Sequence, residues 1–250
     1  MPHLTLAIET SNPPSPGGGS VALGLVERAG PEDPAGRVEV LGVEPLRPVD
    51  RDRDDLMPAI DRLVRRAGRA PAEVSLVAVS MGPGGFTALR VACATGKLIA
   101  TATGGGTPAL CVAVPSALSA ALSAPADARS GPLAVALAAK AGVVHLTLLA
   151  PGFERKGSAP AGRLADAAAI AALSPAGVMI ADRHLPAEIR AAATRIGWRV
   201  VEPSWDARSV LAAAAHVPTV QADALNPLYA REPEAVTLWR ARHGGGGAAG

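Results

Sequence analysis

Residues 74–103 read VSLVAVSMGPGGFTALRVACATGKLIATAT and place a strand, a glycine loop and a helix in direct succession. The run 74–79 is short, apolar and bounded by turn residues, as is typical of a strand buried on both faces. The glycine loop at 82–85 then ends any regular element. From Phe86 the residues are small or apolar, apart from one narrow polar stripe of Thr87, Arg90, Lys97 and Thr101. Such a helix needs cover on more than one side. We expect the protein's own sheet on one side, and a second chain is a candidate for the other.

The glycine loop has two interpretations. Free backbone N–H groups at a helix N-terminus attract phosphate, which makes Gly82, Gly84 and Gly85 candidate phosphate contacts. The spacing matches neither the Walker loop nor the dinucleotide-binding loop. The alternative is a tight turn that sets the angle between the strand and the helix. Farther along the same helix, Gly96 costs about 1 kcal/mol relative to Ala, so we expect a packing reason for it.

Two motifs carry a family resemblance. GPGGFTALR, residues 82–90, closely resembles the glycine-Phe-Thr-Leu-Arg motif of the TsaB (YeaZ) family. Residues 224–242, ALNPLYAREPEAVTLWRAR, resemble the ending typical of the same family, so the likeness spans most of the chain. Members of this family are non-catalytic paralogues of TsaD and are required for threonylcarbamoyladenosine formation in tRNA. The resemblance therefore implies a role in tRNA modification.

Composition limits the classes of partner. The chain has 250 residues, of which 49% are hydrophobic, enough for one large domain or two smaller ones. Aromatic residues make up only 2%, which argues against a surface that stacks single-stranded nucleic acid. The formal net charge of +2 is too small to form an electrostatic footprint by itself. We therefore expect tRNA to be contacted locally or indirectly, through a partner.

Several features favour the cytoplasm. The two cysteines, Cys93 and Cys111, have small apolar neighbours, so we expect buried free thiols rather than a disulfide. The N-terminus enters a strand pattern directly, with no basic leader and apolar core of a signal peptide. Because no stretch of about 18 residues is continuously apolar, we expect no membrane segment.

The first half predicts three meandering strands followed by helix, strand, helix, strand and helix. By resemblance, this order is the ribonuclease H-like half-domain of the actin, sugar kinase and heat-shock ATPase superfamily. In that superfamily a carboxylate and hydroxyls after the first strand contact metal and phosphate, and here Glu9, Thr10 and Ser11 stand at that point. The following loop, 12–19, contains three prolines that lack an N–H donor, which favours a mobile hairpin tip over a nucleotide cradle.

The second half repeats part of this pattern. Hairpin strands at 133–137 and 143–149 echo the first hairpin, and we expect a helix at 164–173 and a final alanine-rich helix at 209–215. We therefore predict an α/β protein with two ribonuclease H-like lobes, the second reduced: residues 1–124, residues 125–243, and a flexible tail at 244–250. The turn 138–142 contains no Asp, Glu, Ser or Thr, so a second acidic phosphate loop is missing.

The residues for catalysis are also missing. The five histidines form no i, i+4 pair and no cluster with Cys or acids, whereas TsaD carries a helical His-x-x-x-His metal pair. There is no Gly-x-Ser-x-Gly elbow, and no base lies near either cysteine in sequence. We therefore expect no catalytic residue, metal or cofactor. Glu9 and Asp182 are candidates to face one cleft, but lone acids at strand ends are more often caps or solvated.

The resemblance implies a scaffold that pairs with a TsaD-like catalytic paralogue and recruits a TsaE-like ATPase through the complex. The expected interface is an apolar face of two helices, although such faces usually serve a protein's own core. Its candidate residues are Leu56, Ile60, Leu63, Phe86, Thr87, Leu89, Arg90 and Cys93. When the chain is alone, we expect the same apolar helix faces to pair two copies in a symmetric homodimer.

For Arg90 in this set, two roles remain alternatives: pairing inside the fold and contact across the interface. We expect Glu at position 60 or 89 to abolish pairing but leave the monomer folded. The alternative function is an ATPase or kinase. It would hold phosphate with the loop at Glu9, Thr10 and Ser11 and with the glycine loop at 82–85.

Overall fold

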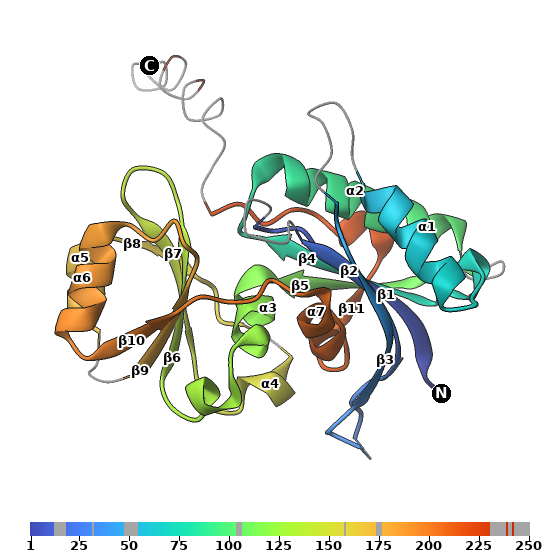
Figure 1. The fold of residues 1–250 in the computed structure, drawn as a ribbon, viewed down its shortest axis with the longest axis horizontal. Helices are drawn as coiled ribbons and strands as arrows, with labels where there is room; N and C mark the ends of the chain where they lie inside the picture. Colours follow the sequence, from blue (N-terminus) through green and yellow to red (C-terminus); the bar gives the residue numbers. More distant parts are fainter. Residues whose placement is uncertain are drawn as a thin grey trace, which may run out of the picture.

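The computed structural model describes residues 1–12, 19–31, 33–47, 55–103, 107–157, 159–173, 177–230, 239 and 242. Most of the first hairpin loop, the beginning of the predicted first helix and the predicted tail 244–250 lie outside these residues. The described part forms two mixed sheets with helices on both faces of each (Figure 1).

The first sheet has the strand order β11-β5-β4-β1-β2-β3. The three leading strands form an antiparallel meander, and β4 and β5 continue from β1 in parallel. Apolar runs form these strands, and every side chain of β1 after His3 is buried. The strands are β1 (His3–Glu9), β2 (Ser20–Glu27), β3 (Arg37–Pro45), β4 (Leu76–Gly82), β5 (Leu110–Pro115) and β11 (Thr219–Val220).

The second sheet repeats the topology of the first. Its order, β10-β9-β6-β7-β8, reproduces β5-β4-β1-β2-β3 strand for strand, with the same parallel and antiparallel pairings. The predicted two-lobed ribonuclease H-like fold is therefore confirmed. The strands are β6 (Leu133–Ala138), β7 (Val144–Leu149), β8 (Arg163–Ala165), β9 (Gly177–Ala181) and β10 (Trp198–Val201).

The predicted helix at 164–173 is wrong in its first part. Residues 163–165 form β8, which pairs with β7 and supplies the third antiparallel strand of the repeated unit. Only α5 (Ala167–Ala171) is helical, and Asp166 begins it by accepting a hydrogen bond from the Ala169 N–H at 2.8 Å. Sheet pairing, which is not local in sequence, has overridden the helical pattern of this short segment.

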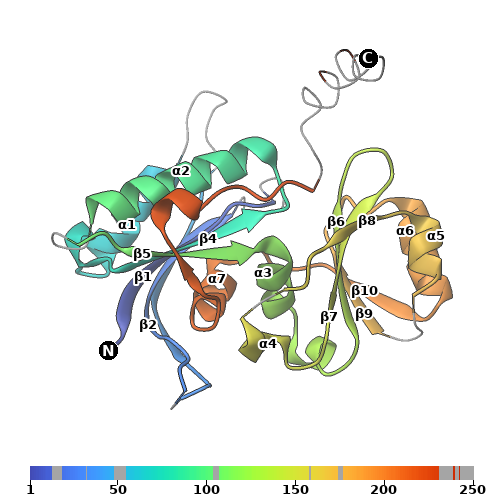
Figure 2. The ribbon, with the colours of Figure 1, turned by 180° about the vertical axis from the view of Figure 1, so that it is seen from behind.

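Helices and sheets alternate in five layers (Figures 1 and 2). The outer face of the first sheet is covered by α1 (Leu56–Arg66) and α2 (Phe86–Ala102), and the outer face of the second by α5 and α6 (Ala187–Arg195). Between the sheets lie α3 (Ser116–Ser123) and α7 (Ala207–Ala214). The remaining short elements are α4 (Phe153–Lys156) and the 3₁₀ turns Pro71–Glu73, Ala126–Arg129 and Ala222–Ala224.

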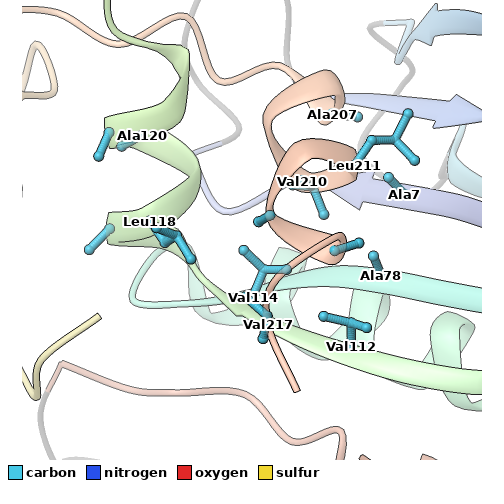
Figure 3. Close-up of a cluster of buried hydrophobic side chains, with 14 of the residues drawn as sticks. Ala7, Ala78, Val112, Val114, Leu118, Ala120, Ala207, Val210, Leu211 and Val217 are labelled. Atoms are coloured by element: carbon cyan, nitrogen blue, oxygen red, sulfur yellow. The ribbon is translucent and has the colours of Figure 1, made fainter. Parts of the chain in front are cut away.

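The layer between the sheets forms one continuous core. Small side chains of the first sheet, such as Ala7 and Ala78, meet Val210 and Leu211 of α7, and Leu118 of α3 lies in the same cluster (Figure 3). Inner-face residues of the second sheet, including Val135, belong to it as well. The two repeated units are therefore joined by apolar packing.

This packing changes the division of the chain. The sequence places everything after residue 124 in the second lobe, but α7 packs on the first sheet and β11 pairs with β5 at the edge of that sheet. Just after the predicted boundary at residue 124, the 3₁₀ turn Ala126–Arg129 buries Ala128 in the shared core. The second repeated unit thus ends near β10, because α7 packs its apolar side chains against the first sheet and β11 pairs with the edge strand of that sheet.

Gly96 has the packing reason that its sequence position predicts. A Cβ at this position would lie 2.8 Å from Val79 Cγ2 and 2.9 Å from Leu225 Cδ2. The helix α2 is therefore covered by its own strand β4 on one side and by the returning C-terminal segment on another. The small residues do not need a second chain to explain them.

An acid–arginine cluster attaches α1 to β3. The Arg62 guanidinium donates to both Asp55 carboxylate oxygens at 2.9 and 2.7 Å and to Glu44 Oε1 at 2.8 Å, and Arg66 adds an ion pair to Glu44 at 2.8 Å. Both carboxylates are buried. The hydrogen bonds from Arg62 lower the pKa of Glu44 and of Asp55 below their ordinary values.

We expect Arg62→Ala to lower the free energy of unfolding measurably at neutral pH, because it leaves two buried carboxylates without their main donor. A lowered pKa stabilises the fold above the unfolded pKa, near 4, and this stabilisation is lost as the pH falls through the folded pKa. The deficit should therefore shrink near pH ~3. Urea denaturation at neutral pH and at pH ~3 measures the loss of unfolding free energy at each.

The matched control is Arg65→Ala on the same helix, since Arg65 pairs with Asp61 at 2.8 Å in a pair that is mostly exposed. Its effect should stay within about 0.5 kcal/mol. Equal losses for the two variants would contradict the assigned role of the cluster.

Candidate functional site

Glu9 is fully buried among hydroxyl groups at the end of β1. Its Oε1 accepts hydrogen bonds from the Ser11 N–H at 2.8 Å and from the Ser11 hydroxyl at 2.6 Å. Its Oε2 lies 2.6 Å from Ser119 Oγ of α3, which lies 2.7 Å from Ser209 Oγ of α7. Burial raises the pKa of the Glu9 carboxyl, and the hydrogen-bond donors offset this rise only in part.

The segment 9–11 and the glycine loop at 82–85, the two predicted phosphate contacts, lie side by side. Their polar groups form hydrogen bonds within the protein. The Gly85 N–H donates to the Ser11 carbonyl at 2.7 Å, and the Thr10 hydroxyl donates to the Ala88 carbonyl at 3.3 Å. A Cβ on Gly84 would lie 1.9 Å from the same Ser11 carbonyl. The amide groups of Ser11 and Gly85 are thus already used within the protein, and Gly84 is explained by this close approach.

The third candidate glycine has a separate reason. Gly82 has φ +117°, and a Cβ there would lie 2.2 Å from the Leu228 carbonyl oxygen. The Leu228 N–H in turn donates to the Met81 carbonyl at 2.7 Å. The two sequence motifs, far apart along the chain, therefore pack directly on each other.

Five of the eight residues predicted for a partner interface lie in the protein's own core. Each is at most 7% exposed, and the five are Leu56, Ile60, Leu63, Leu89 and Cys93. That part of the interface assignment is corrected, because these side chains fill the space between the helices and the first sheet. Because Ile60 and Leu89 are buried, we no longer expect a variant with Glu at either position to leave the monomer folded.

The exposed surface of α1 and α2 is made by other residues. Met57, Phe86 and Leu98 are 49%, 45% and 63% exposed, and Thr87 and Arg90 are exposed beside them. We call Met57, Phe86, Thr87, Arg90 and Leu98 the α1–α2 face. Met57 and Leu98 were not among the residues predicted for this surface. Leu98 lies one residue after Lys97, on the stripe of α2 that was predicted to be polar. An apolar residue on that stripe is the sequence signal that would have indicated its exposure.

The C-terminal segment completes this region. Tyr229 stacks on Phe86 with ring centroids 4.9 Å apart, and its hydroxyl accepts a hydrogen bond from Arg90 Nε at 2.9 Å. Lys97 Nζ donates to the Asp223 carbonyl at 3.2 Å and to Asn226 Oδ1 at 2.9 Å. Arg90 is thus paired within the fold, and its contact across an interface stays a prediction.

The two repeated units also meet near the ends of β1 and β9. The buried Asp182 accepts hydrogen bonds through Oδ2 from the Ala138 N–H at 3.1 Å and from Asn12 Nδ2 at 3.5 Å. Its Oδ1 accepts from the His184 N–H at 2.8 Å. Asp182 therefore works as a cap between the two units, and it does not contact Glu9 in any hydrogen bond of the described residues.

A comparison with family models matches residues 38–206 to the family described as TsaD: tRNA N6-adenosine threonylcarbamoyltransferase. The chain belongs to the TsaD family. The matched segment runs from β3 through the whole second sheet and stops just before α7. A comparison with curated proteins gave no match.

Solved structures similar to this TsaD-family chain show the same fold. One is YeaZ from Pseudomonas aeruginosa, with a TM-score of 0.62, 20% identity, and coverage of 91% of this chain and 99% of that one. Another, from the same organism, is an uncharacterized protein with similarity to peptidase YEAZ, with a TM-score of 0.60, 20% identity, and coverage of 92% and 100%. The sequence resemblance is therefore confirmed at the level of the family and of the fold.

The other candidate groups of this TsaD-family chain are buried or dispersed. Burial raises the pKa of the Cys93 thiol to about 11 and also raises that of Cys111. Both thiols therefore stay protonated at neutral pH. Among the described residues, no group of three or more His, Cys, Asp and Glu side chains is arranged to hold a metal ion. None of the helices in the described ranges is long and apolar enough to cross a bilayer.

Proposed function

We propose that this chain is a non-catalytic scaffold subunit for the synthesis of N6-threonylcarbamoyladenosine in tRNA. In this role it pairs with a TsaD-like catalytic paralogue, and the pair recruits a TsaE-like ATPase and transfers threonylcarbamoyl from its adenylate to an adenosine beside the anticodon. Membership of the TsaD family supports the pathway. The internal bonding of the loops around Ser11 supports a scaffold role over an ATPase or kinase.

One observation carries the choice of docking surface. The outer helix layers of the two repeated units are structural equivalents, yet only the first exposes large apolar side chains: Met57, Phe86 and Leu98. On α5 and α6 no described large apolar side chain is exposed. Both layers cover one face of their own sheet, and the extra apolar surface of the α1–α2 face supports a partner at this layer.

We expect Leu98→Glu to weaken binding to the TsaD-like protein of the same cells by about thirtyfold or more, because it places a charge in an apolar interface. The thermal midpoint should not change, since Leu98 is 63% exposed. Calorimetric titration of one purified protein into the other measures the affinity. The matched control is Ala191→Glu, an exposed position on α6 in the equivalent outer layer.

Unchanged affinity of the Leu98 variant would exclude this face as the docking surface. Failure of the unmodified proteins to bind would overturn the proposed function itself. Tight magnesium-dependent binding of ATP by the isolated chain would favour the competing ATPase hypothesis. The same face is also expected to pair two copies when the chain is alone, which sedimentation velocity over a concentration series detects.

A further inference from the structure

Three side chains at the beginning of α2 hold one another in place. The guanidinium carbon of Arg90 lies 3.9 Å from the centroid of the Phe86 ring, and Arg90 Nε donates to the Tyr229 hydroxyl at 2.9 Å. Tyr229 stacks on Phe86 at an interplanar angle of 28°. We call Phe86, Arg90 and Tyr229 the Arg90 cluster. Tyr229 is the only tyrosine of the chain, so its place on this exposed surface is not a consequence of abundance.

The cluster fixes the direction of the guanidinium. Its carbon lies over the Phe86 ring, and the bond to Tyr229 uses the Nε–H and so limits its rotation. No hydrogen bond or ion pair of the two terminal nitrogens, Nη1 and Nη2, is found among the described residues. These nitrogens form an end-on pair of parallel donors, the geometry that a carboxylate accepts in bidentate fashion. An arginine held in this way loses little side-chain entropy on binding.

The surroundings favour a protein over RNA as the source of the carboxylate or other anion. The π surface of Phe86 is already engaged by Tyr229 and Arg90, so it is not a free platform for a nucleobase. Met57 and Leu98 extend the exposed apolar surface along the two helices. Tyr, Phe, Met and Arg at the edge of an apolar patch are the composition typical of a protein interface.

We propose that the Arg90 cluster is a preformed anchor of the α1–α2 face, whose Nη1 and Nη2 receive a carboxylate side chain of the TsaD-like partner. Arg90 makes the contact, and Tyr229 is the positioning residue that holds it. This inference rests on the proposed function, since it names the chemistry by which that partner is recognised. It also gives the packing of the C-terminal segment on α2 a purpose beyond stability.

The test is calorimetric titration of full-length variants into the purified TsaD-like protein. Arg90→Ala should weaken binding about tenfold or more, and Arg90→Lys should recover only part of it because Lys keeps the charge but lacks the fork. Tyr229→Phe, which keeps the stacking ring and removes only the hydroxyl, should weaken binding several-fold with an unchanged thermal midpoint. Arg190→Ala, an exposed arginine on α6, is the control and should bind like the unmodified chain.

Salt supplies a second measurement. The unmodified complex should weaken as salt rises, and this dependence should be smaller for Arg90→Ala, because one charged contact is absent. Equal affinity and equal salt dependence for the Arg90 variants, in a complex that the unmodified chain does form, would overturn the inference and leave the proposed function standing. No binding by the unmodified chain would overturn both.

Three further outcomes would also overturn it. If Glu232→Gln with Glu234→Gln weakens partner binding as much as Arg90→Ala, the carboxylate belongs to this chain, which carries both acids just after Tyr229. If Arg90→Ala reduces only self-association in sedimentation, the occupant is a second copy. If it reduces only binding of tRNA in a filter assay, the anion is a phosphate.

Discussion

Replacing Leu89 by Glu is expected to unfold the protein or to lower its free energy of unfolding by about 4 kcal/mol or more. Leu89 is completely buried, where α2 faces the first sheet and the glycine loop. A carboxylate there would lose its hydration without gaining a partner. Circular dichroism melting and urea denaturation measure the loss, and we expect poor recovery of soluble protein.

The control for this prediction lies on the same helix. Leu98→Glu introduces the same charge at a position that is 63% exposed and should change stability by no more than about 0.5 kcal/mol. The pair separates folding from docking, because Leu98→Glu is expected to lose the partner and keep the fold. A Leu89 variant with the unmodified denaturation midpoint would show that this side of α2 is not packed in solution.

Replacing Glu9 by Ala is expected to cost about 3–4 kcal/mol of stability, whereas Glu9→Gln should cost no more than about 1 kcal/mol. The difference comes from the count of protons in the buried network. Ser209 Oγ lies 2.6 Å from the Asp206 carbonyl and can only donate to it. One arrangement that satisfies every contact has Ser119 donating to Ser209 at 2.7 Å and a neutral Glu9 donating to Ser119 at 2.6 Å, whereas a charged Glu9 accepts from Ser119 instead.

A protonated Glu9 supplies that proton, and a Gln amide supplies its equivalent. The carbonyl oxygen of Gln would still accept from Ser11, as Glu9 Oε1 does. Ala removes both functions and leaves the buried Ser11 and Ser119 without this partner. Urea denaturation at acidic pH, on the side where the raised pKa of Glu9 favours the neutral carboxyl, gives the cleanest comparison.

The pH dependence of the same pair tests the protonation state. Because the folded pKa of Glu9 is raised, its contribution is fully present below the unfolded pKa and is lost as the pH rises through the folded pKa. The Gln variant cannot ionise, so it should gain stability relative to the unmodified protein as the pH increases. Parallel stability curves for the two proteins would contradict a neutral Glu9.

Much of the fold follows from local patterns. The apolar runs and the glycine loop predict the order of elements through α3, and the echo between the two hairpins predicts the second unit. Two elements were assigned differently. The segment at 163–165 became a strand and α7 joined the first sheet, because in both places the deciding contacts are made with residues distant in sequence.

The candidate site was predicted less completely. Phe86, Thr87 and Arg90 were predicted on a partner surface and are exposed. Leu89 and four other residues were predicted on the same surface but lie in the core. The sequence did not indicate Tyr229 as the neighbour of Arg90, although both lie in motifs of the same family. It also gave no sign that Ser119 and Ser209 would meet Glu9.

Local residue patterns are enough to predict that α2 is a helix, that it follows a buried strand through a glycine loop, and that it must be covered on several sides. Which sides are covered depends on the packing of the whole chain. The residues of α2 are small or apolar on almost every side. The sequence therefore does not distinguish the side that faces β4, the side that Leu225 covers and the side that is exposed at Leu98. Those contacts join residues that are remote along the chain, and periodicity describes only neighbours within one element.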